Sequence, residues 1–237
     1  MKKILFFIIA ISFVSTFQSC AQFLKNLQRA VEQTAPYTEQ DAAGAIREAL
    51  VKGTGKGVDI VSVVNGYLGN PEIKIPFPPE AAQIEATLRN AGFGSRVDQV
   101  ITSINRAAEL AATEAKPIFV SAITGMTITD AINIVKGPDN AATEYLKRTT
   151  TTGLTDAFKP VISDALEKVN ATKYWDDLIN TYNLIPFVKK MDPDLSGYVT
   201  TKAIDGLFVM IAKEELNIRK DPLARTSELL KKVFGNE

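Results

Sequence analysis

The spacing of apolar residues constrains this chain more than any other feature, because apolar side chains recur every three or four positions from about residue 40 onward. In "DAAGAIREALVKG", the residues Ala42, Ala45, Ile46, Ala49 and Leu50 fall on one face of an α-helix. The alternation of apolar and polar residues that is typical of β-strands is scarce. The sequence therefore predicts an all-α fold that buries one face of each helix.

Signals for helix ends divide this pattern into segments. Thr38 and Asp41 form a capping box that predicts a helix start, and Thr127 and Asp130 form another. The prolines of "NPEIKIPFPPE" forbid a regular helix there and predict an extended loop. Asp221, followed by Pro222, predicts the start of a last helix.

Three stretches predict interruptions within helical segments. "GTGKG", at residues 53–57, predicts a helix break or a close approach of two helices. Pro117 predicts a kink in a long alanine-rich helix. The four threonines at residues 149–152 predict a bend. No repeat or linker divides the rest, so we expect a single multi-helix domain over residues 38–237.

The N-terminus predicts export from the cytoplasm. Lys2 and Lys3 precede an apolar run from Ile4 to Val14, and small residues follow up to Cys20. This order is that of a secretory signal peptide. The apolar run is shorter than the ~20 residues that a membrane-spanning helix needs, which disfavours a permanent anchor. We therefore expect a signal peptide over residues 1–19, then a tether with a short helix over residues 20–37.

Cys20 is the only cysteine, so no intramolecular disulfide can form. "FQSC" resembles a bacterial lipobox: Ser19 is the small residue required before the cysteine, whereas Phe17 and Gln18 depart from the usual pattern. The alternative is ordinary cleavage after Ala21, which would give a soluble periplasmic or secreted protein. The favoured prediction is a lipid anchor on Cys20 at the periplasmic face of the outer membrane.

Composition excludes several classes of function. Lys+Arg and Asp+Glu both number 27, so no basic excess favours nucleic acid as a partner. The sequence has no histidine, which excludes His-based catalysis and His metal ligands. "GTGKG" lacks the spacing of a phosphate-binding loop and follows a helix rather than a strand. We predict no cofactor.

Charged side chains among small apolar residues are the candidates for a pocket. Arg106 and Glu109 are three residues apart between alanines, which lets another helix approach closely. Asp205 and Arg225 lie in similar surroundings. Either these residues are solvated surface pairs, or some are buried pairs that hold the register of the helices. If a pocket exists, we expect Arg106, Glu109, Asp205 and Arg225 to line it.

"MDPDLSGYVTTKA" offers a weak candidate for a calcium site. Asp192, Asp194 and Ser196 match positions 1, 3 and 5 of an EF-hand loop, but Ala203 replaces the glutamate that donates two oxygens at position 12. The favoured alternative is a connector between two helices, in which Gly197 has positive φ and a threonine caps the next helix.

Several segments, read in order, are similar to one family. They are "LGNPEIKIPFP", "INRAAELAA", "MTITDA", "GPDNAATEYLKRTT", "YVTTKAIDGLF" and "EELNIRKDPLARTSELLKKVFG". From about Leu50 to Gly235 the chain resembles the domain of unknown function 4197, a bacterial family of exported helical proteins. The resemblance implies a helical fold and an exported location, and it implies no catalytic residue.

These observations favour an envelope lipoprotein whose helical domain binds or scaffolds a partner without catalysis. Its partners would be the membrane, through Cys20, and an envelope protein or an apolar ligand. Two alternatives remain open, a hydrolase that uses carboxylates and a carrier of an apolar ligand. Facing carboxylates in a deep pocket would favour the hydrolase, and a shallow apolar groove would favour the binding module.

Overall fold

The computed structural model describes residues 38–168, 170–173, 175–176, 180, 194–225 and 227–234. Contacts divide the chain into two compact units, one formed by Met1–Thr38 with Asn236 and the other by Glu39–Gly235 with Glu237. The predicted signal peptide, tether and Cys20 lie outside the described residues, as does Asp192.

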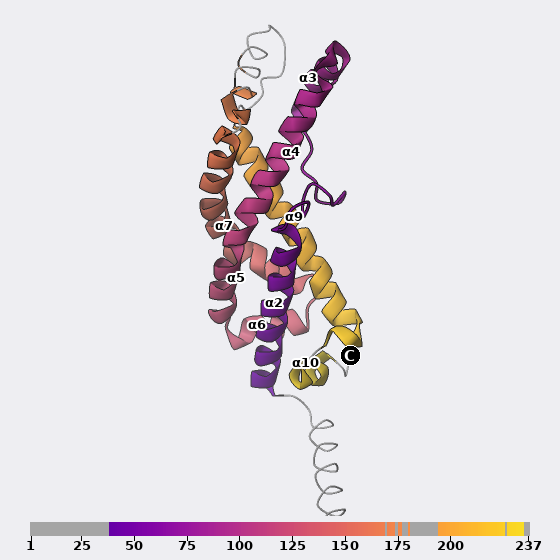
Figure 1. The fold of residues 1–237 in the computed structure, drawn as a ribbon. Coiled ribbons are helices and arrows are strands. Elements are labelled where there is room, and N and C mark those ends of the chain that lie inside the picture. Colours follow the sequence, from indigo (N-terminus) through magenta and orange to yellow (C-terminus); the bar gives the residue numbers. More distant parts are fainter. Residues whose placement is uncertain are drawn as a thin grey trace, which may run out of the picture. The chain divides into compact units, whose positions relative to one another are not determined.

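The second unit is built from helices, and its described residues contain no β-strand (Figure 1). An all-α domain is therefore confirmed. Its hydrophobic core lies within the unit, as in a domain that folds independently. In chain order the elements are α2 (Glu39–Val61), η1 (Pro79–Ala81), α3 (Ala82–Leu88), η2 (Arg89–Phe93), α4 (Gly94–Ala111), η3 (Ala112–Glu114), α5 (Ala115–Thr124), α6 (Ile128–Val135), α7 (Ala141–Lys168), α9 (Leu195–Lys220), η4 (Pro222–Ala224) and α10 (Glu228–Phe234).

Helix α9 is the central element of the core, with its most extensive packing against α2 and α7 (Figure 1). It also contacts α4, and its Phe208 ring meets Phe119 of α5 edge to face, with ring centroids 6.0 Å apart. By length and composition alone α9 could cross a membrane, as could residues 82–124 and 128–135 counted as one bent span. A core helix meets the same criterion, and 61% of the apolar window of α9 is buried in the fold.

The glycines of α2 serve close packing and do not interrupt the helix. The predicted break at residues 53–57 is wrong, because α2 continues to Val61. A Cβ atom on Gly57 would lie 3.1 Å from Cγ1 of Ile211 in α9. The glycine therefore lets α2 and α9 approach more closely than any larger residue would allow, which is the other outcome that the sequence left open.

Helix α7 runs as one helix through its four threonines and through Pro160. The bend predicted at the threonines therefore does not divide it into two helices. The hydroxyls of Thr150 and Thr151 donate to carbonyls four residues earlier, at 2.7 and 2.6 Å. Leu154 and Phe158 are fully buried in the same helix. Packing of this face against α9 and α4 outweighs the weak helix propensity of threonine.

The other predicted helix ends agree with the structure in most cases. The capping box at Thr127 and Asp130 begins α6, with both of its reciprocal hydrogen bonds present. The chain breaks near Pro117 at η3, and the proline sits in the first turn of α5, where it is tolerated. Asp221 caps the short turn η4 rather than a long helix, and α10 begins only at Glu228.

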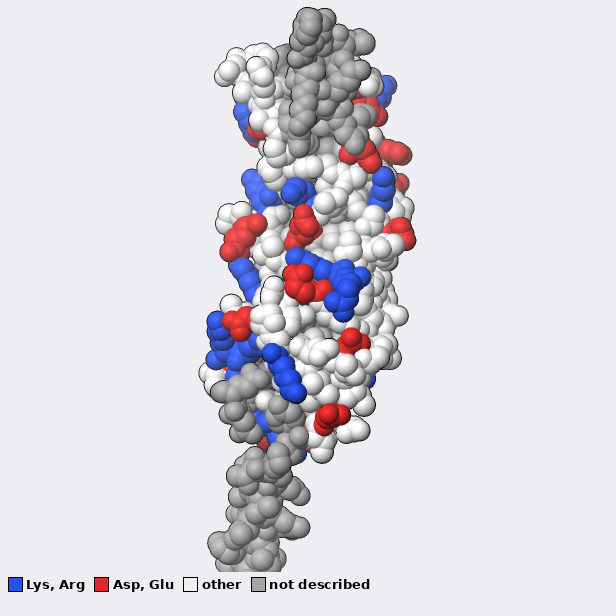
Figure 2. Space-filling view, turned by 180° about the vertical axis from the view of Figure 1, so that it is seen from behind, with Lys and Arg blue, Asp and Glu red and all other residues white. Residues whose placement is uncertain are grey.

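Charges of both signs alternate over the surface seen in Figure 2, which shows no large field of one sign. This distribution agrees with the balanced composition of 27 basic and 27 acidic residues. Between α2 and η1 the chain forms a long irregular segment, residues 62–78, and this segment leads to the candidate site.

Candidate functional site

The connecting segment 62–78 is anchored in the core by Tyr67. Its side chain is fully buried, and its hydroxyl donates to the carbonyl of Ala203 in α9 at 2.5 Å. Gly206 provides the space, because a Cβ atom there would lie 2.8 Å from Cε1 of Tyr67. Burial first, and the charge of Glu109 second, raise the pKa of the Tyr67 phenol far above its ordinary value. The ring therefore fixes the middle of the segment to α9.

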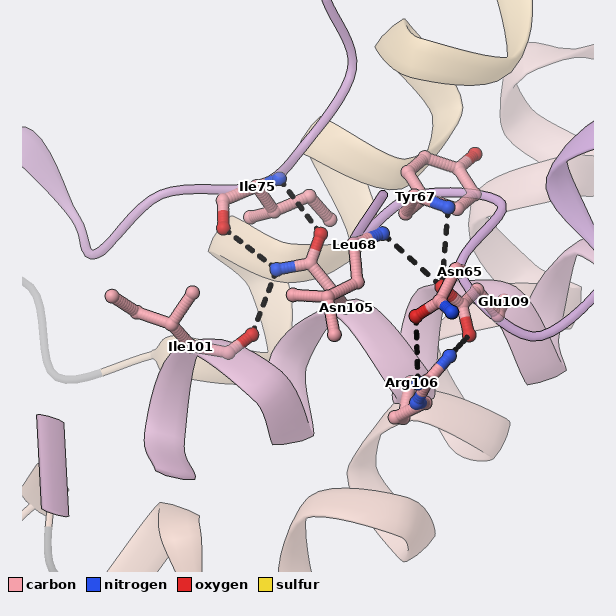
Figure 3. A network of polar contacts seen from close by, with 8 residues as sticks. All are labelled: Asn65, Tyr67, Leu68, Ile75, Ile101, Asn105, Arg106 and Glu109. Carbon is pink, nitrogen blue, oxygen red and sulfur yellow. Dashed lines mark hydrogen bonds and ion pairs between the residues drawn. The ribbon is translucent and has the colours of Figure 1, made fainter. Parts of the chain in front are cut away.

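Glu109 of α4 supplies the hydrogen bonds that this irregular backbone lacks (Figure 3). Its Oε1 accepts the backbone N–H groups of Tyr67 and Leu68, each at 3.1 Å. Its Oε2 accepts from Nη1 of Arg106 at 2.5 Å, and Nη2 of Arg106 donates to Oδ1 of Asn65 at 2.9 Å. Because Glu109 is only 4% exposed, these donors replace the water that it loses on folding.

Asn105, one residue before Arg106, holds the same segment further along (Figure 3). Its Oδ1 accepts the N–H of Ile75 at 2.8 Å, while its Nδ2 donates to the carbonyls of Ile75 at 2.8 Å and Ile101 at 2.7 Å. The side chain is fully buried. The amide thus pairs with both backbone groups of Ile75 as a neighbouring strand would. Asn105, Arg106 and Glu109, which we call the α4 clamp, fix the segment at two points.

A second buried carboxylate, Glu215 of α9, holds other helix ends together. It accepts the backbone N–H groups of Ala142 and Thr143, at 2.9 and 2.8 Å, and so caps the N-terminus of α7. It also pairs with Arg219, which donates to the carbonyl of Ile134 at the end of α6. Both buried carboxylates are thus fully engaged with donors, which is the arrangement of structural ion pairs.

The four residues predicted for a pocket separate into three places. Arg106 and Glu109 form the predicted ion pair within the α4 clamp. Asp205 is exposed on α9, 3.9 Å from Lys202. Arg225 donates to the carbonyl of Ile218 at 3.1 Å, near the C-terminal end of α9. No contact among the residues that the structure describes joins Asp205 or Arg225 to the clamp.

The described part of the calcium-like stretch is helical. Asp194 caps α9 by accepting the N–H of Gly197 at 2.8 Å, and it pairs with Lys159 at 2.9 Å. Lys159 first, and that N–H second, lower the pKa of the Asp194 carboxyl. Ser196 is buried within α9. The expected positive φ at Gly197 is wrong, and the cap is Asp194 instead of a threonine, because the helix begins at Leu195. Over the residues described, no cluster of three or more acidic, His or Cys side chains could hold a metal ion.

Beside the α4 clamp lies an open groove of about 960 Å³, within the roughly 300–1,000 Å³ range of ligand pockets. Besides the small side chain of Ala171, three lining side chains are at most 5% exposed, and these form its floor: Phe77, Val97 and Trp175. Phe77 and Trp175 meet edge to face, with centroids 5.3 Å apart. The remaining lining residues are Leu88, Phe93, Ser95, Arg96, Asp98, Gln99, Val100, Thr102, Ser103 and Ala171.

The clamp positions part of this groove. Ile75, which Asn105 holds by both backbone groups, lies two residues before Phe77. The clamp therefore fixes the backbone two residues before the ring that meets Trp175. Arg106 and Glu109 could be identified from the sequence, whereas Asn105 and the groove could not. The signals available were a phenylalanine between the prolines of the loop and the only tryptophan of the chain.

Comparison with known proteins identifies a family for this chain. No curated protein and no solved structure matches the chain. A family model described as "Protein of unknown function (DUF4197)" matches residues 36–235, which include all of the described helices. The chain therefore belongs to the DUF4197 family.

Proposed function

We propose that this protein is an exported bacterial lipoprotein whose helical domain is a non-enzymatic binding module, with the groove beside α4 as its binding surface. The groove carries the proposal. It is open, its floor is formed by buried apolar side chains, and most of its surface is apolar, although six of its thirteen lining residues are polar or charged. An apolar surface of this kind, exposed on one side, is typical of sites for a partner or an apolar ligand.

The carboxylates support binding rather than hydrolysis. A catalytic acid needs a raised pKa, which an apolar pocket or a facing carboxylate can produce. Where the described carboxylates have a shifted pKa, at Glu48, Asp130, Asp139 and Asp194, hydrogen bonds to nearby groups lower it. Glu109 and Glu215, the buried carboxylates, hold backbone N–H groups and arginines. We therefore do not propose the hydrolase.

A fluorescent apolar probe tests the groove. We would use the chain from Ala21 onward, called the truncated chain below, and titrate it with N-phenyl-1-naphthylamine. Val100→Arg places a charge in the groove and should weaken probe binding at least about tenfold, the equivalent of about 1.4 kcal/mol. Val120→Arg, at an exposed position of α5, is the matched control and should change nothing. Failure of the unmodified chain to bind the probe, or equal binding by the Val100 variant, would refute the proposed site.

Metabolic labelling with a radioactive fatty acid tests the anchor. Cys20→Ala should abolish the label, whereas Ser19→Ala should retain it because alanine is also small. Density-gradient separation of the membranes should then place the labelled protein in the outer membrane. Label on the Cys20 variant, or its absence from the unmodified chain, would refute the lipoprotein assignment.

A further inference from the structure

The groove combines an apolar floor that contains two aromatic rings with polar side chains in the rest of its lining. Phe77 and Trp175 form part of its floor, and Leu88, Val97 and Val100 extend the apolar lining. Leu88, Val97 and Val100 lie in helices and Phe77 lies in the irregular segment 62–78, so the described residues of the groove offer no sheet edge to pair with an extended peptide. A slender apolar body, such as an acyl chain, matches such a surface without requiring polar partners along its length.

At the rim stands a cation, Arg96, that has no acidic partner among the described residues. Arg96 lies over the ring of Phe93, 5.5 Å from its centroid. No described carboxylate lies within ion-pair distance of its guanidinium, although Asp98 is only two residues away. Asp98 instead pairs with Arg89 at 2.9 Å. The rim therefore presents the positive charge of Arg96 beside the apolar floor.

The floor also contains a polar atom for which the described part of the chain supplies no hydrogen-bond partner. Nε1 of Trp175 is buried and has no hydrogen-bond acceptor among the described residues, although the side chain lines the groove. Thr172, one helical turn earlier, has a buried hydroxyl that likewise finds no partner among the residues that the structure describes. An unsatisfied buried donor costs about 1–3 kcal/mol, so native proteins seldom keep one without a reason. A small turn of the indole toward the groove would let a bound molecule supply the acceptor.

We propose that the groove binds a single-chain amphiphile with an anionic head group, such as a fatty acid or a lysophospholipid. The acyl chain lies over Phe77, Val97 and Trp175, and the carboxylate or phosphate pairs with Arg96. An oxygen of the ligand near the head group accepts the indole N–H of Trp175. This inference rests on the proposed binding function and specifies its ligand class.

The chain's only tryptophan makes the test direct, because all tryptophan emission comes from Trp175. We would titrate the truncated chain with a fatty acid that carries bromine atoms on its acyl chain, below the concentration at which it forms micelles. Bromine quenches indole emission at near contact. We expect saturable quenching by the brominated acid, and competition for the site by its unbrominated counterpart.

Head-group variants test the role of Arg96. Arg96→Gln should weaken binding about three- to tenfold, the range expected for an exposed charge-assisted contact. The methyl ester of the same acid, which has no charge, should bind the unmodified chain more weakly by a similar factor. Lys202→Gln removes an exposed charge of α9 that does not line the groove, and it should leave binding unchanged. Parallel titrations with a brominated lysophospholipid show whether a carboxylate or a phosphate is preferred.

The outcomes separate this inference from the proposed function. Binding of the apolar probe without quenching by either brominated amphiphile would overturn the amphiphile and leave the binding module standing. Displacement of the probe by an amphipathic helical peptide, but by neither amphiphile, would likewise overturn it in favour of a protein partner. Quenching that is equal for acid and ester, and unaffected by Arg96→Gln, would overturn the anionic head group.

Discussion

Removal of the Glu109 carboxylate should destabilise the domain far more than removal of its arginine partner. Glu109→Ala deprives the N–H groups of Tyr67 and Leu68 of their acceptor. Each such loss costs about 1–3 kcal/mol when the group is buried. The Tyr67 N–H is buried, whereas that of Leu68 is only partly so and can regain water. We therefore expect a loss of about 2–4 kcal/mol in the free energy of unfolding.

Arg106→Ala provides the comparison. The Arg106 side chain is 38% exposed, so its pair with Glu109 is screened by solvent and contributes only about 0–1 kcal/mol. Glu109→Gln should fall between the two variants. Its amide oxygen can still accept from the backbone, while its amide nitrogen faces the guanidinium, where a donor is unfavourable.

Urea unfolding of the truncated chain measures these differences, with far-ultraviolet circular dichroism reporting the helices and Trp175 emission reporting the groove. Equal losses for Arg106→Ala and Glu109→Ala would show that the ion pair, and not the backbone contacts, holds the segment. A loss below about 1 kcal/mol for Glu109→Ala, within the range of an ordinary surface substitution, would refute the clamp altogether.

Three other variants extend this reasoning. Gly206→Ala should lower the free energy of unfolding in urea by about 1–3 kcal/mol, because the new Cβ would meet the Tyr67 ring. Gly55→Ala, where a Cβ would have nothing within 4 Å, should raise that free energy by about 0.5–1 kcal/mol. A loss of stability at Gly55 would contradict this expectation. Glu215→Ala leaves a buried guanidinium unpaired and should cost about 3–5 kcal/mol, against less than about 0.5 kcal/mol for exposed Asp164→Ala. The raised pKa of Tyr67 keeps the phenol neutral in the folded state. The contribution of this phenol to the free energy of unfolding is therefore complete below about pH 10, and above that pH it falls by up to about 1.4 kcal/mol per pH unit. Tyr67→Phe should therefore lose less stability above about pH 10 than the unmodified chain does. Equal slopes of the free energy of unfolding against pH for the two proteins would refute this prediction.

Local signals in the sequence predicted the fold wherever neighbouring residues decide the structure. The capping box at Thr127 and Asp130 is complete within four residues, so it could be identified without tertiary information. The glycines of α2 could not be interpreted this way. Their effect depends on Ile211, more than 150 residues later in the chain, which packs against Gly57. Packing between distant helices decided that case against local propensity.

The candidate site shows the same limit more strongly. Arg106 and Glu109 stood out in the sequence because alanines surround them. The structure shows them as an ion pair in which Glu109 is buried and Arg106 is partly exposed. Asn105 carries no such signal, since its role depends on Ile75 arriving beside α4. The groove brings together a loop phenylalanine, the first turns of α4 and a distant tryptophan. Only the folded path of segment 62–78 makes them neighbours.

The position of α9 has a consequence for the order of folding. This helix packs against α2, near the start of the domain, and Glu215 completes the N-terminus of α7. Neither contact can form until residues 195–220 have been synthesised, close to the end of the chain. Contacts so distant in sequence delay folding, because the intervening chain must first be ordered. If the protein is exported, as we propose, a chain that stays open during synthesis could pass through a narrow translocation channel before its core closes.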